Sequence, residues 1–183
     1  MYTCEGGTLR LWIAGICLAL LQAGTVREEQ SNAFRIAPVE GRRLALLQDA
    51  VELTSISIPS DVSASSIEDG IQKTLRDSGG AALAVSIRRA RQSFIVVFMR
   101  IESGQWTAVD ISPIERMNIG VIGPDRAYQN FETEPVEWQH WPGGIPDDRL
   151  VIVVRTRVWD TAGKRYTMQQ PLIMMPDGSP AWR

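Results

Sequence analysis

The chain has 183 residues, which is enough for one ordinary domain with a hydrophobic core and short for two. Its formal net charge is −2, so it lacks the basic balance typical of nucleic-acid-binding proteins, and we expect no nucleic acid among its partners. It has one histidine, whereas a histidine-based zinc site normally needs several.

The first 23 residues have the three parts of a secretory signal. Arg10 precedes an uncharged apolar run over residues 11–21, and the chain turns polar after Ala23. The run is shorter than the roughly 20 residues that span a bilayer. We therefore expect a cleaved signal peptide over 1–23, a periplasmic or extracellular protein, and no stable transmembrane span after cleavage. The alternative is a hydrophobic helix of the folded domain.

Both cysteines lie in or before that apolar run. Cleavage would remove Cys4 and Cys17 and leave a mature chain without disulfides, thiolate metal sites or a cysteine nucleophile. Cys17 also allows a lipoprotein interpretation, against which the bulky Ile16 before it counts. The sequence thus predicts a cysteine-free mature domain.

The segment after the leader contains weak patterns and then a strand. We expect residues 24–41 to be a flexible tether or an edge segment, and leave 42–50 open between a short helix and a strand. Residues 51–58 are rich in β-branched side chains and predict a strand that ends at Pro59. Its apolar residues switch parity along the run, which indicates a bulge.

A helix is predicted over 66–78. Ile67, Ile71 and Leu75 recur at i, i+4 and i+8, which places them on one helical face. Serines precede this segment as N-cap candidates, and Gly79 with Gly80 would end it.

Strands are predicted on the C-terminal side of this helix. Residues 83–87 alternate, 93–101 form an apolar run suited to a strand covered on both faces, and 106–111 return before Pro113. Residues 117–122 form a possible further strand, ended by a Gly-Pro-Asp turn.

The rest of the chain divides into a loop and a hairpin. Residues up to Asp148 contain prolines and paired glycines, which indicates a long irregular loop of the kind that is often functional. Residues 150–159 are the clearest predicted strand, 160–164 form a turn, and 166–175 return. Pro171 would interrupt a ladder, so the return strand is expected at an edge or broken there.

These elements predict a mainly β protein of the α+β class. We expect an antiparallel or mixed sheet of six to seven strands with one packed helix over 66–78, in a single domain over 42–183. The alternative is two small β-rich subdomains that divide near 113.

The predicted loop contains most of the candidate functional residues. His140 has a suitable pKa for a general base, and Glu137 is close enough in sequence to share a metal with it, but an ordinary loop histidine is the simpler interpretation. Trp138 and Trp141 would bind a partner if exposed, or would anchor the loop if folded inward.

Charged residues offer three further candidates. An acidic cluster at Glu132, Glu134, Glu137, Asp147 and Asp148 could bind calcium or act as paired carboxylates, or could simply be solvated.

The basic group Arg88, Arg89 and Arg91 could meet a phosphate or an acidic partner, or could be a soluble turn. Arg155 and Arg157 share a strand face with Trp159, and this face suits a partner if exposed, whereas covered arginines must find carboxylates.

The sequence favours an exported, non-catalytic binding or assembly protein of the cell envelope, with no cofactor and no metal. One alternative is a secreted hydrolase that uses carboxylates of the 132–148 loop, with His140. Another is a structural subunit that docks through an unpaired edge near Pro171 and the tail at Trp182. The residues predicted to recognise a protein or envelope component are Trp138, His140, Trp141, Arg155, Arg157 and Trp159.

Overall fold

The architecture comes from a computed structural model that describes residues 34–90, 92–123, 127–140 and 149–181. The predicted signal peptide and both cysteines lie outside these residues. Phe34–Arg183 form one compact unit. No helix in the described ranges is long and apolar enough to cross a membrane.

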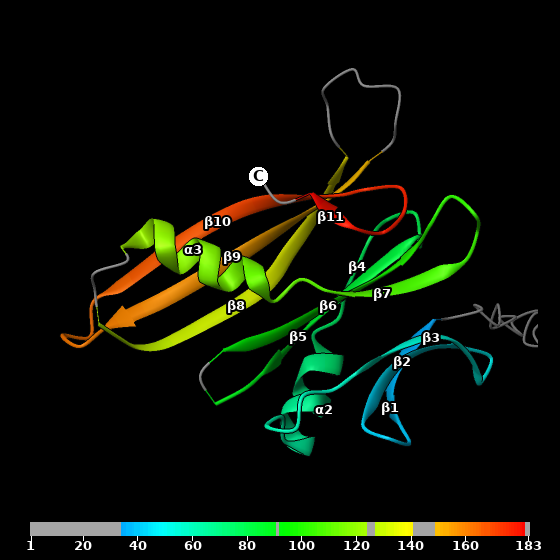
Figure 1. Cartoon of the computed structure of the whole chain (residues 1–183), viewed down its shortest axis with the longest axis horizontal. Coiled ribbons are helices and arrows are strands. Elements are labelled where there is room, and N and C mark those ends of the chain that lie inside the picture. Colours follow the sequence, from blue (N-terminus) through cyan, green and yellow to red (C-terminus); the bar gives the residue numbers. More distant parts are fainter. Residues whose placement is uncertain (1–33, 91, 124–126, 141–148, 182–183) are drawn as a thin grey trace, which may run out of the picture. The chain divides into compact units, whose positions relative to one another are not determined.

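The described residues form three antiparallel sheets and two helices (Figure 1). The mainly β, α+β class is therefore confirmed, while the prediction of one sheet with one helix is wrong. We call the sheets first, middle and C-terminal. The strand order of the first sheet is β1 (Arg35–Val39), β2 (Arg43–Gln48), β3 (Val51–Ser57). The order of the middle sheet is β4 (Leu75–Arg76), β5 (Ala82–Arg88), β6 (Ser93–Arg100), β7 (Trp106–Asp110). The order of the C-terminal sheet is β11 (Pro180–Ala181), β10 (Arg165–Met174), β9 (Leu150–Asp160), β8 (Tyr128–His140).

The middle sheet is covered on both faces, as the apolar run of β6 predicts. Val85, Val96 and Phe98 belong to a core shared with the first sheet and with helix α2 (Ala64–Gln72). On the opposite face, Ala84 and Val97 belong to a second core. That core is shared with the C-terminal sheet and with helix α3 (Pro113–Ile122). Strands β5 and β6 therefore contribute to both cores.

The first sheet settles two open points of the sequence. Residues 43–48 are a strand, and residues 35–39, which we placed in a flexible or edge segment, are the edge strand β1. The predicted bulge in 51–58 is present, because Leu46 pairs with Thr54 while Leu47 pairs with Glu52. This register shift leaves Leu53 as the extra residue and accounts for the parity switch.

Helix α2 begins at Ala64, two residues before the predicted start, and ends at Gln72 rather than Ser78. Ser63 is the N-cap and accepts a hydrogen bond from the backbone N–H of Ser66. The hydroxyl of Thr74 donates to the carbonyl of Ile71 at 2.7 Å. The next residue, Leu75, begins strand β4 and pairs with Ala84 of β5. Sheet pairing thus overrides the helical periodicity of the last predicted turn.

The predicted strand over 117–122 is wrong, because these residues belong to α3. Pro113 occupies the first turn, where its missing N–H costs nothing, and Ile114 and Asn118 share the buried face. The β-branched residues Ile119, Val121 and Ile122 suggested a strand, but they continue the helix that begins at Pro113.

The predicted irregular loop is also wrong over residues 128–140, which form β8. Its partner across the ladder is β9, with register shifts at Tyr128/Asn130 and at Pro135/Glu137. The predicted hairpin of β9 and β10 is present. Residues 141–148, the remainder of the predicted loop, lie outside the described residues.

The turn before β11 generates a stability prediction. Gly178 is buried with φ +86°, and a Cβ there would lie 2.5 Å from Cγ2 of Thr107. Gly163 has a similar φ of +78° but open space around it. Gly163→Ala should therefore cost only the left-handed strain, about 1–2 kcal/mol, and Gly178→Ala should cost about 1–3 kcal/mol more from overpacking. Urea unfolding of both variants measures the difference, and equal costs would contradict the packing of this turn.

Candidate functional site

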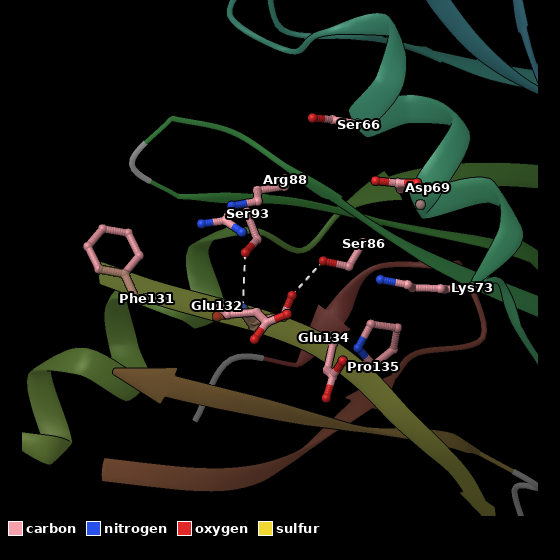
Figure 2. A pocket seen from close by; sticks show the side chains of 12 residues that line it. Ser66, Asp69, Lys73, Ser86, Arg88, Ser93, Phe131, Glu132, Glu134 and Pro135 are labelled. Carbon is pink, nitrogen blue, oxygen red and sulfur yellow. Dashed lines mark hydrogen bonds between the residues drawn. The ribbon is translucent and has the colours of Figure 1, made fainter. Parts of the chain in front are cut away.

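A small groove lies between α2 and β8, above the ends of β5 and β6 (Figure 2). It encloses about 190 Å³, less than the roughly 300–1,000 Å³ of pockets that hold drug-sized ligands. It suits a side chain or another small polar group. The lining residues are Ser66, Asp69, Gly70, Lys73, Ser86, Arg88, Ser93, Phe131, Glu132, Thr133, Glu134 and Pro135.

Two serines of the middle sheet position β8 along this groove. The hydroxyl of Ser86 donates to the carbonyl of Thr133, and the backbone N–H of Thr133 donates to the hydroxyl of Ser93 at 3.0 Å. Figure 2 shows both bonds as dashed lines. Thr133 is buried on an edge strand, so these bonds satisfy backbone groups that would otherwise be buried unpaired.

A buried polar network continues behind Thr133. The carboxylate of Glu115, which is 1% exposed, accepts from the backbone N–H of Ser93 at 2.9 Å. Asn118 donates to the hydroxyl of Thr156 at 2.8 Å, and that hydroxyl lies 3.1 Å from the hydroxyl of Thr133. Helix α3 is thereby linked to β6, β8 and β9, which fixes the wall of the groove.

The outer face of β8 and β9 contains a network of ion pairs. Arg155 and Arg157 both donate to one oxygen of Glu134 at 2.7 Å, and Arg157 also reaches Glu132 at 3.1 Å. Arg155 opposes Glu134, and Arg157 opposes Glu132, in the ladder register. Both arginine side chains are half-buried, and glutamates of the predicted acidic cluster are their partners. We call this set the charge ladder.

The facing wall of the groove has charges without such partners. Asp69 comes from α2, Lys73 is the C-cap residue of that helix, and Arg88 comes from the end of β5. All three side chains are exposed, and none forms an ion pair within the described part of the chain. One wall is thus neutralised and the other is not.

Of the two arginines of the predicted basic group that the structure describes, Arg88 lines the groove and Arg89 does not. Arg89 instead forms an ion pair with Asp61 at 2.8 Å. The hydrogen bond from Arg89 lowers the pKa of the Asp61 carboxyl. Arg91 lies outside the described residues. Arg88 is therefore the member of this group that lines the groove.

The predicted aromatic residues take different positions. Trp138 is half-buried in β8, packs against the second core, and points its indole N–H toward the carbonyl of Leu75 at 3.5 Å. Trp138 is therefore folded inward, as a residue of a strand and not of a loop. Trp159 is half-buried in β9, opposite Arg165 and Asn130. His140 is the last residue of β8, and Trp141, Asp147 and Asp148 lie outside the described residues.

The sequence analysis missed α2 as a wall of the site. Ser66, Asp69 and Lys73 follow helical spacing on a face adjacent to the core-facing Ile67 and Ile71, and this spacing was the available signal. Within the described residues, no group of three or more His, Cys, Asp or Glu is arranged to hold a metal ion.

Comparisons of the chain with protein-family models, with curated proteins and with solved structures found no match.

The serines under β8 generate a second prediction. Ser86→Ala and Ser93→Ala should each destabilise the fold by about 1–3 kcal/mol, because each leaves a buried backbone group of Thr133 unpaired. Chemical denaturation measures the cost. Ser65→Ala is the control, since Ser65 is exposed and hydrogen-bonds only within a surface serine cluster. A cost no larger than that of the control would contradict the role of these serines.

The ion pair beside Arg88 generates a third prediction. Because the folded pKa of Asp61 is below its unfolded value, the pair stabilises the protein above the unfolded pKa, and this contribution is lost as pH falls through the folded pKa. Arg89→Met should raise the pKa of Asp61 toward its ordinary range. NMR titration of the carboxyl measures this, with Arg116→Met on α3 as control. An unchanged Asp61 pKa in Arg89→Met would rule out this cause.

Proposed function

We propose that this chain is an exported, non-catalytic protein that binds or assembles with a protein partner or another component of the cell envelope. Export is supported by the basic, apolar and small-residue pattern of residues 1–23. The groove between α2 and β8 is the main recognition surface of the proposal.

The observation that carries this proposal is the difference between the two walls of the groove. Arg155, Arg157 and Glu134 satisfy one another in the charge ladder, so that wall is ordered before any partner arrives. Lys73, Arg88 and Asp69 on the other wall form no ion pairs among the described residues. A partner side chain in the groove would gain ionic contacts with them without breaking an existing pair.

The chemistry of the groove favours binding over hydrolysis. Glu132 and Glu134, the groove carboxylates that the hydrolase alternative would use, are both held by arginines. Trp138 packs into the core. The aromatic residue of the proposed surface is therefore Trp159, which lies on the same strand face as Arg155 and Arg157. This strand face extends the recognition surface beyond the groove.

The test is partner capture from the native host with wild-type and charge-reversed proteins. The double variant Lys73→Glu, Arg88→Glu should weaken binding of the captured partner by at least about tenfold, and the wild-type affinity should fall with added salt. Arg116→Glu, an exposed arginine on α3, is the matched control.

Equal binding by the double variant and the control would remove the groove from the proposal. Turnover of a substrate that depends on Glu132 or Glu134 would replace binding with catalysis.

A further inference from the structure

We propose that β10 pairs antiparallel with β10 of a second copy, about a twofold axis at Thr167. The partner is a copy of this chain, and the joined strands continue the C-terminal sheet across both molecules. This inference is independent of the groove.

Among the described strands, none but β11 pairs with the outer side of β10. β9 pairs with it from Arg165 to Ile173, while on the other side β11 covers only Ile173 and Met174. Arg165, Thr167 and Gln169 are exposed, and no described strand pairs with their outer side. The opposite edge of the same sheet is different, because Ser86 and Ser93 bind the backbone of Thr133 there.

The turn between β9 and β10 shows which backbone groups face the open side. The N–H of Asp160 donates to the carbonyl of Lys164 at 3.0 Å, so these two residues form a hydrogen-bonded pair. Antiparallel ladders alternate, so Tyr166, Met168 and Gln170 bond inward to β9. Arg165, Thr167 and Gln169 therefore direct their N–H and C=O groups to the open edge. The pairing of Ile173 with Ala181 of β11 has the same parity.

Pro171 closes the open segment. It has the same outward parity as Thr167 and Gln169, so its missing N–H removes a donor from the edge and none from the ladder with β9. Between the turn and Pro171, three consecutive outward positions remain available.

These three positions match themselves in one register. With Thr167 on the axis, Thr167 faces its own copy and Arg165 faces Gln169, so all three outward residues pair. Between them, Tyr166 faces Met168, which brings a thioether to an aromatic ring.

Other registers are worse. Moving the axis by one residue toward the turn places Gln169 opposite Gly163 of the turn, and that backbone pairing is lost. Moving it by one residue the other way places Arg165 opposite Pro171, and that pairing keeps only one of its two hydrogen bonds. Moving it by two residues toward the turn places Arg165 opposite Arg165, where like charges repel. The sequence of β10 therefore specifies the Thr167 register.

Disulfide trapping tests the geometry. In a variant of the full chain with Cys4 and Cys17 replaced by serine, Thr167→Cys should form a disulfide-linked dimer on mild oxidation. Residues facing each other in a hydrogen-bonded pair have Cα atoms about 5.5 Å apart, a separation that disulfides span. Thr161→Cys, exposed in the turn of the same hairpin, is the matched control.

Thr167→Cys should give at least about tenfold more linked dimer than Thr161→Cys at equal concentration. Equal yields would show random collision and overturn the proposal.

A second pair of variants tests the association itself. Thr167→Lys places two ammonium groups opposite each other on the axis and should weaken the dimer by at least about tenfold in sedimentation velocity. Thr161→Lys adds the same charge away from the axis and should leave the dimer unchanged. A wild-type chain that stays monomeric across the dilution series, or equal effects of both lysines, would overturn the proposal.

Discussion

The hydrogen bonds to the backbone of Thr133 are the constraint on which the rest of the structure depends. Strand β8 ends its sheet, and its buried backbone N–H and C=O at Thr133 need partners that no neighbouring strand supplies. Ser93 and Ser86, from adjacent strands of another sheet, supply both. Thr133 thereby links by hydrogen bonds two sheets that share no strand and that otherwise meet mainly through the second core.

This join extends into an otherwise apolar core. Glu115 accepts from the backbone N–H of Ser93, Asn118 donates to the hydroxyl of Thr156, and that hydroxyl bonds to the hydroxyl of Thr133. Helix and strands thus share one set of hydrogen bonds. Apolar contacts between the sheets are non-directional and allow sliding. The polar network allows one arrangement, because any shift would leave buried donors and acceptors unpaired. This hydrogen-bond network therefore also fixes the geometry of the groove beside α2.

Elements were predictable from the sequence where the local pattern and the tertiary environment agree. β6 and β9 contain long apolar or alternating runs, and burial on both faces or on one face follows directly from them. β8 was missed because Pro135 and its glutamates resemble a loop. Pro135 has the same parity as Thr133, so its missing N–H faces the sheet edge and breaks no bond to β9. The glutamates are strand residues whose arginine partners lie far along the chain.

The site was less predictable for a related reason. Asp69, Arg88 and Glu134 are remote in sequence. Their elements meet at one groove because Ser86 and Ser93 hydrogen-bond the edge of β8 there. Spacing in α2 could indicate a polar face, but not what lies opposite. The arginines of β9 were expected to need carboxylates if covered; they are half-buried and pair with Glu134, a partner that their spacing along the chain could not identify.

The two edges of the C-terminal sheet lead to different consequences. The β8 edge is used within the molecule, and the groove lies beside it. On the far side of β9, the β10 edge is paired by no described strand except the short β11. Pairing of two copies through β10 would give the strand order β8-β9-β10-β10-β9-β8 along one continuous sheet. Both grooves would then lie at its outer ends and stay free. Such a dimer offers two equal sites, and a partner with repeated binding segments would gain avidity with no new contact in either groove.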